Sequence, residues 1–140
     1  MKRIAGLVGV LLLCAPLAGR AGDDGLFQDL GGRDRISAFT TDLVGRIKQD
    51  PRISHFFDET DMDRLHDRLT DMFCHLTGEQ RRYRGANMYR AHEQLGITDA
   101  AFNALVEDLE KAMDDYEVPW GTQARFLSVL APMKKLIVEK

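Results

Sequence analysis

Apolar residues recur at intervals of three and four along most of this chain, a spacing that places them on one face of an α-helix. No segment alternates between apolar and polar residues with a period of two, so no β-strand is expected. The sequence therefore predicts an all-α fold. Its expected elements are a short helical piece over 26–30, long helices over 34–48 and 62–76, a short helix over 87–95, a long helix capped by Thr98, and a final helix from Pro119.

Several residues predict where these helices begin, bend and end. Gly31-Gly32 predicts a sharp corner because glycine adopts positive φ at little cost, and Asp50-Pro51 ends the first long helix. Thr60 is expected to cap the second long helix. Pro132 lies inside the last apolar stripe and predicts a kink, since the stripe continues beyond it. The aromatic pair Phe56-Phe57 lies between two predicted helices and belongs to neither apolar stripe. We therefore expect these two rings to cover another part of the molecule.

The short helix over 87–95 carries the residue with the most distinctive chemistry, His92. Met88 and Leu95 lie four and three residues away on the same predicted face, so the imidazole projects from an apolar stripe. A histidine in such a place is ordinarily a core residue that is hydrogen-bonded to a neighbour. The alternative is an iron porphyrin, which needs one axial nitrogen ligand and a dry surround.

The N-terminal residues have a different pattern from the rest of the chain. Lys2 and Arg3 precede an apolar run over 4–13, and small residues follow up to Ala21. This arrangement is typical of a secretory signal peptide, and the run is shorter than the roughly 20 residues of a transmembrane helix. We therefore expect residues 1–21 to be cleaved, leaving a periplasmic or secreted protein with no stable membrane insertion.

The remainder, residues 22–140, is predicted to form one domain, since 44% of the chain is apolar and its length suits a single core. Lipid attachment at Cys14 is disfavoured because Leu13 is not the small residue that such processing requires. Cleavage removes three positive charges, so the formal net charge changes from −3 to −6. An acidic protein is a poor partner for nucleic acid. Cys74 would be left without a disulfide partner and is expected to be a buried apolar residue.

A set of short motifs in this chain resembles the group I truncated haemoglobins, which are small two-on-two globins. The motifs occur in the family's order and cover nearly everything after residue 21. They imply a fold in which two antiparallel helix pairs cross around a haem. The matching pieces are Leu30-Gly31-Gly32, Asp50-Pro51, Phe56-Phe57, Thr60-Asp61-Met62, Arg64-Leu65, Tyr83-Arg84-Gly85, Met88, Ala91-His92, Leu95-Gly96-Ile97-Thr98, Val118-Pro119 and Leu130-Ala131-Pro132.

The resemblance implies a role for each matching residue. His92 would be the proximal ligand of haem b iron through Nε2, while its other ring nitrogen bonds to backbone or water. Phe57 would pack against the porphyrin, and Arg68 would reach a haem propionate. No Cys-x-x-Cys-His motif is present, so covalent attachment of the c type is not expected. The remaining wall would be formed by Leu65, Leu69, Phe73, Met88, Phe126 and Leu130.

Two distal positions depart from the family pattern. The tyrosine and glutamine that help some members hold dioxygen correspond here to Val44 and Leu69, which cannot donate a hydrogen bond. Bound dioxygen carries partial negative charge and benefits from a donor, whereas CO and NO need one less. The expectation is a gas-binding protein for O2, NO and CO with weak stabilisation of O2. NO dioxygenase or weak peroxidase activity, supported by an unknown reductase or electron donor, is a less favoured reading.

Two further hypotheses compete with this one. His66 could act as a second axial ligand opposite His92, giving a six-coordinate haem for electron transfer or for NO and peroxide redox chemistry. A helical domain without a cofactor is the remaining alternative. The protein is expected to be a monomer or weak dimer. Gly78-Glu79 stands where the family commonly has two glycines, so the loop before the His92 helix departs from the pattern.

Overall fold

The computed structural model describes residues 25–85 and 87–139, so the predicted signal peptide lies outside the described residues. All regular structure in those two ranges is helical, as the periodicity predicted. None of these helices is long and apolar enough to cross a membrane. The elements are α1 (Leu26–Asp29), α2 (Gly32–Gln49), the 3-10 turn η1 (Ser54–Phe57), α3 (Met62–Thr77), α4 (Met88–His92), α5 (Asp99–Asp115), α6 (Trp120–Leu130), the 3-10 turn η2 (Ala131–Met133) and α7 (Lys134–Ile137).

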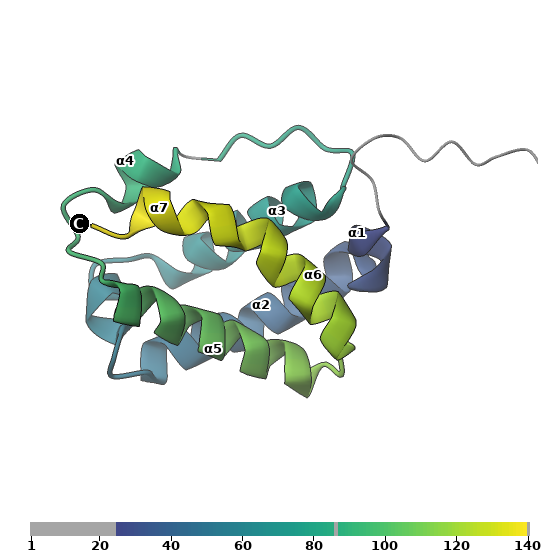
Figure 1. Cartoon of the computed structure of the whole chain (residues 1–140), viewed down its shortest axis with the longest axis horizontal. Coiled ribbons are helices and arrows are strands. Elements are labelled where there is room, and N and C mark those ends of the chain that lie inside the picture. The colour runs from purple at the N-terminus through teal and green to yellow at the C-terminus, as the bar shows by residue number, and fades with distance from the viewer. Residues whose placement is uncertain (1–24, 86, 140) are drawn as a thin grey trace, which may run out of the picture.

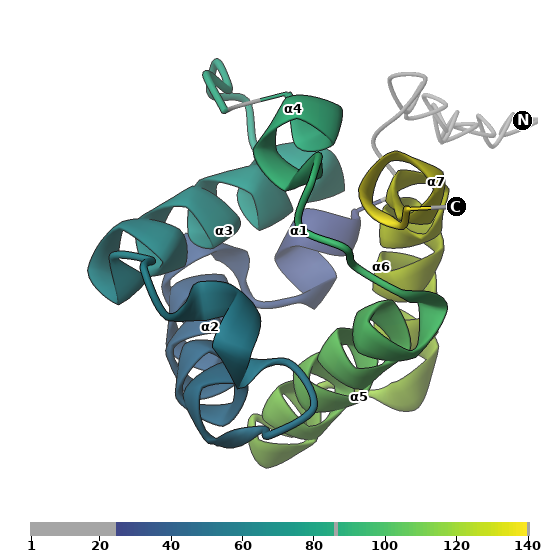
Figure 2. The same ribbon diagram turned by 90° about the vertical axis from the view of Figure 1, so that its left-hand side faces the viewer.

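The long helices form two pairs (Figure 1). Helix α2 packs against α3 and also against α5, and α5 packs against α6. Figure 2 shows α2 and α3 on one side and α5 and α6 on the other, with the short α4 beside α7. The predicted arrangement of two helix pairs is therefore present. In Figure 2 the short α4 lies between α3 and α7.

The core is built on the apolar stripe of α2 and on three aromatic rings. The predicted stripe positions Ile36, Phe39, Leu43 and Ile47 are all buried. Phe126 of α6 lies 6.3 Å from Phe39 between ring centroids. It also meets Phe73 of α3 edge to face, with ring centroids 5.1 Å apart. These contacts hold the two helix pairs together, because aromatic rings bury large areas and favour tilted packing.

The helix caps agree with the sequence in one place and differ in another. Thr98 caps α5 as expected, since its hydroxyl accepts a hydrogen bond from Ala101 N. At α3 the predicted cap, Thr60, is wrong, because Asp61 accepts the hydrogen bond from Arg64 N at 3.1 Å. The extended backbone at Asp61 places its carboxylate over the open N–H groups. Its negative charge is also favoured at the positive end of the helix dipole.

The predicted corner and kink are both present. Gly31 and Gly32 have φ values of 94° and 76°, a region that residues with a Cβ adopt only with strain. Pro132 lies in η2, which separates α6 from α7. The chain therefore bends at the proline and continues as a helix, as expected for a ring that removes one backbone donor.

Two buried carboxyl groups meet where α2 ends against α5. Asp50 is 8% exposed and Asp108 is 4% exposed. The Arg52 guanidinium donates hydrogen bonds of 3.0 and 2.9 Å to the Asp50 carboxylate and holds the pKa of Asp50 well below its usual range. Burial, followed by the hydrogen bond with Asp50, raises the pKa of Asp108 to about 6. The fold therefore disfavours the ionised form of Asp108, whose Oδ2 is buried without a hydrogen-bond partner among the described residues.

Replacing Asp108 with asparagine is expected to stabilise the protein at pH 8 and to matter much less near pH 4. The folded pKa of Asp108 is raised, so its contribution to stability is present below its ordinary pKa and is lost as the pH rises through about 6. The difference between the variant and the wild type should grow by up to about 3 kcal/mol over this range. Urea unfolding at pH 4 and pH 8 measures it.

Asp58→Asn is the matched control because Asp58 is exposed in the turn after η1. Its free energy of unfolding, relative to the wild type, should change little between the two pH values. A difference between Asp108→Asn and the wild type that stays constant with pH would contradict the assignment.

Candidate functional site

The predicted metal-ligating histidine lies at the end of α4 and is held in one orientation. Asn87 caps this helix, since its side chain accepts a hydrogen bond from Arg90 N at 3.2 Å. His92 Nδ1 lies 2.7 Å from the Met88 carbonyl oxygen, to which an Nδ1–H donates. This hydrogen bond assigns the proton to Nδ1 and leaves a lone pair on Nε2. The same arrangement is common for histidines that ligate metals.

Only part of the predicted apolar face around His92 is formed. Met88 is half-buried on the same side of α4, as expected. Leu95 is not on that face, because α4 ends at His92 and Leu95 is 44% exposed. Gln94 adopts a positive φ of 66° and turns the chain away from the helix. The prediction of a helix continuing to Leu95 is therefore wrong.

Six predicted pocket residues are half-buried in the structure. Core side chains are buried and surface side chains are exposed. Partial burial of an apolar side chain is what we expect beside a ligand site. They come from helices on both sides of the molecule in Figure 2 and from η1. These side chains are therefore apolar and partly accessible, as the resemblance implies for residues beside a flat hydrophobic cofactor. The six are Val44, Phe57, Leu65, Leu69, Met88 and Leu130.

Two other predicted wall residues lie in the core. Phe73 is 4% exposed and Phe126 is 0% exposed, and the two rings pack edge to face. They fill the crossing between α3 and α6, where large rings are needed. Both side chains are therefore part of the hydrophobic core, and their contact with a haem stays a prediction.

Arg68 is exposed on α3, where it faces the loop that precedes α4. Its guanidinium donates to the Arg84 carbonyl oxygen at 3.4 Å. An arginine at this edge can hold a carboxylate at the boundary with solvent, as its predicted role toward a propionate requires.

Comparison with known proteins identifies the family of this chain. A sequence-family model described as bacterial-like globin matches residues 25–139. A group 1 truncated haemoglobin of Tetrahymena pyriformis is 30% identical over 93 residues, covering 66% of this chain and 77% of that protein. One from a Synechocystis species is 30% identical over 115 residues, covering 79% of this chain and 93% of that protein. This chain belongs to the group 1 truncated haemoglobins.

Solved structures show the same fold. The Fe(III) form of the Tetrahymena pyriformis truncated haemoglobin has a TM-score of 0.79 at 27% identity, covering 82% of this chain and 98% of that one. A cyanomet 2/2 haemoglobin from a Synechococcus species, with covalently attached haem, has a TM-score of 0.76 at 23% identity over the same shares. The expected two-on-two fold is confirmed. Membership of a globin family also implies a haem cofactor.

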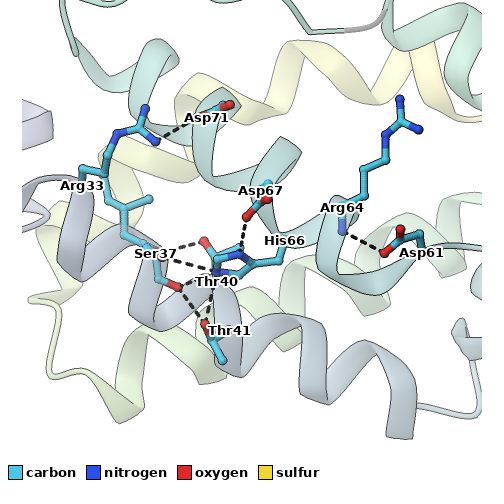
Figure 3. A network of polar contacts seen from close by, with 10 residues as sticks. Arg33, Ser37, Thr40, Thr41, Asp61, Arg64, His66, Asp67 and Asp71 are labelled. Atoms are coloured by element: carbon cyan, nitrogen blue, oxygen red, sulfur yellow. Dashed lines mark hydrogen bonds and ion pairs between the residues drawn. The ribbon is translucent and has the colours of Figure 1, made fainter.

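In this truncated haemoglobin, His66 lies in a polar contact between α3 and α2 (Figure 3). Its Nε2 is 3.1 Å from the Ser37 carbonyl oxygen and 3.2 Å from Thr41 Oγ1. Its Nδ1 is 3.1 Å from Asp67 Oδ1. Both ring nitrogens therefore have partners, and the geometry gives the six-coordinate alternative no support.

The interaction that holds the loop before α4 could not be predicted from the sequence. Arg33, at the start of α2, donates hydrogen bonds to both carboxylate oxygens of Glu79 and to Asp71 Oδ1 at 2.8 Å. These bonds hold the pKa of Glu79 below its usual range. The only sequence signal was the unusual Gly78-Glu79 pair. The truncated haemoglobin thus fixes this loop with a partly buried ion pair at Glu79, where the resemblance had led us to expect a glycine.

Replacing Glu79 with glutamine is expected to lower the free energy of unfolding at pH 7 by about 1 kcal/mol, since one charge-assisted contact is lost. The folded pKa of Glu79 is lowered, so its contribution is present above its ordinary pKa and is lost as the pH falls. The variant should therefore approach the wild type at pH 3 in urea unfolding. Glu93→Gln, an exposed change in the turn after α4, should match the wild type at both values. Equal loss in both variants would count against the ion pair.

Proposed function

We propose that this truncated haemoglobin binds haem b through His92 Nε2 and reversibly binds diatomic gases in an apolar pocket. The observation that carries the proposal is the hydrogen bond from His92 Nδ1 to the Met88 carbonyl, which leaves Nε2 able to ligate iron. The half-buried apolar residues support it, because they offer a dry surface to a porphyrin. Exposed Arg68 would hold a propionate at the solvent edge.

The proposal assigns a role to the haem iron and to each residue around it. Haem supplies an iron that binds O2, NO and CO and changes between ferrous and ferric states, so an electron-donating partner is included. The Met88 carbonyl fixes the plane and tautomer of the His92 ring. Leu65 and Leu69 exclude water from the distal side. Val44 and Leu69 carry no donor, so O2 should be held weakly relative to CO and NO.

An absorption spectrum of the purified protein tests the proposal. It is recorded in the ferric form and after dithionite reduction, with and without CO. We expect a five-coordinate ferrous haem that takes up CO at once. A low-spin ferrous spectrum with slow CO uptake would instead require an internal sixth ligand. Protein purified from haem-supplemented cells without a Soret band would contradict the whole proposal.

We also propose that residues 1–21 direct secretion to the periplasm. The basic start, the apolar run and the small residues before Gly22 support this assignment. Cell fractionation and N-terminal sequencing test it, and the expected result is a periplasmic protein that begins at Gly22. Full-length protein confined to the cytoplasm would contradict it.

A further inference from the structure

A concave site lies between α3 and the loop that follows it, and His92 is not among its lining residues. It is a pocket of about 290 Å³, at the lower end of the usual size for small-molecule sites. Five arginines line it, and we call it the arginine pocket: Arg33, Arg68, Arg81, Arg82 and Arg84.

The two carboxylates in the arginine pocket do not balance its charge. Asp71 and Glu79 both accept hydrogen bonds from Arg33 and are neutralised mainly by it. Arg81 Nε lies 3.7 Å from Glu79 Oε1, which already accepts from Arg33. Arg82 and Arg84 form no ion pair with any residue in the described ranges, and neither does Arg68. The pocket therefore carries an excess of positive charge.

This excess stands out in a chain that is acidic as a whole, with 22 Asp and Glu against 19 Lys and Arg. A concave surface lined by one sign of charge concentrates the electrostatic field and attracts counter-ions. Only Arg68 has a predicted role toward haem. The proposed haem site therefore leaves the arginines of the loop, Arg81, Arg82 and Arg84, unexplained.

The loop that carries these arginines is held in place. Tyr83 stacks on the His75 ring, with centroids 5.2 Å apart and planes tilted by 18°. A Cβ added at Gly85 would overlap the Tyr83 phenol, so the backbone and this ring are closely packed. The Arg68 guanidinium donates a hydrogen bond to the Arg84 carbonyl oxygen of the same loop. A site that is already ordered loses less conformational entropy when it binds a ligand.

We propose that the arginine pocket binds a multiply charged oxyanion of the phosphate class. Guanidinium groups present pairs of N–H donors that match phosphate oxygens, and several of them converge here without carboxylate partners. A diphosphate group can bridge two arginines of the loop at once. This binding is independent of gas binding and does not require His92.

The test is isothermal titration of the haem-loaded protein with inorganic pyrophosphate in a low-salt buffer. We expect saturable binding with one site, weakened as NaCl is added. Arg82→Ala/Arg84→Ala should raise Kd by about tenfold or more, since two charge-assisted contacts are lost. Lys48→Ala/Lys111→Ala is the matched control, because it removes two exposed positive charges from α2 and α5. Its Kd should stay close to that of the wild type.

A nucleoside diphosphate titrated in parallel identifies the source of the oxyanion. Equal affinity with pyrophosphate indicates that the phosphates alone are recognised, and tighter binding indicates a nucleotide. The proposal is overturned if pyrophosphate does not saturate, or if the control variant weakens binding as much as the arginine variant. It is also overturned if pyrophosphate binds only after haem is removed, because a haem propionate would then be the anion that occupies the pocket.

Discussion

Replacing His92 with glycine is expected to abolish stable haem binding. The Nε2 lone pair would be the only protein ligand to the iron, while Nδ1 is committed to the Met88 carbonyl. Loss of a residue that only supports a metal ligand typically costs about 10–100-fold in affinity, so loss of the ligand itself should cost more than about 100-fold. The measurement is the rate of haem transfer to a high-affinity apo-globin acceptor.

Imidazole added to the His92→Gly variant should restore the Soret band, because it replaces the lost ring without the covalent link. His55→Gly is the control, since His55 is exposed in η1 and its ring lies tilted against that of Phe56. Its haem transfer rate should equal that of the wild type. If His92→Gly retained haem with an unchanged spectrum, another residue would have to be the ligand.

The double change Val44→Tyr/Leu69→Gln is expected to slow O2 dissociation by at least about 100-fold. It introduces two donors where the present side chains have none, and hydrogen bonds to charged groups contribute roughly 1.5–3 kcal/mol each. CO dissociation should change far less, because CO carries little charge. Stopped-flow displacement of O2 by CO gives the rate.

Val44→Phe/Leu69→Met is the matched control, because it changes side-chain size without adding a donor. It should dissociate O2 at a rate close to that of the wild type. A control that slows O2 as strongly as the donor pair would assign the effect to pocket size. An unchanged rate in the donor pair would show that these positions do not face the bound ligand.

Much of the fold could be predicted from the sequence, because helical periodicity involves residues within one or two turns. The stripe of α2, the glycine corner before it and the bend at Pro132 all follow from such local rules. The family motifs added the two-on-two arrangement. Errors arose at the ends of helices, where Asp61 rather than Thr60 caps α3 and where Gln94 ends the α4 region before Leu95.

The candidate site was predicted less completely. The sequence indicated which residues are apolar, but a stripe position can face either the core or a ligand. Phe73 and Leu69 lie on the same helix, yet the first packs on Phe126 and the second is half-buried. The difference depends on how α3 crosses α6, and no local pattern encodes that crossing.

By itself the sequence determined an all-helical chain and its family, and it indicated His92 as the candidate iron ligand. Only the tertiary structure decided the partners of the polar groups. Arg33 reaches Glu79 across 46 positions of the chain, His66 turns to Ser37 across 29, and Asp108 meets Asp50. Such pairs form because helix packing brings distant segments together and buried polar groups must then be satisfied. The spacing of residues along the sequence predicts neither which helices pack together nor which buried polar groups then pair.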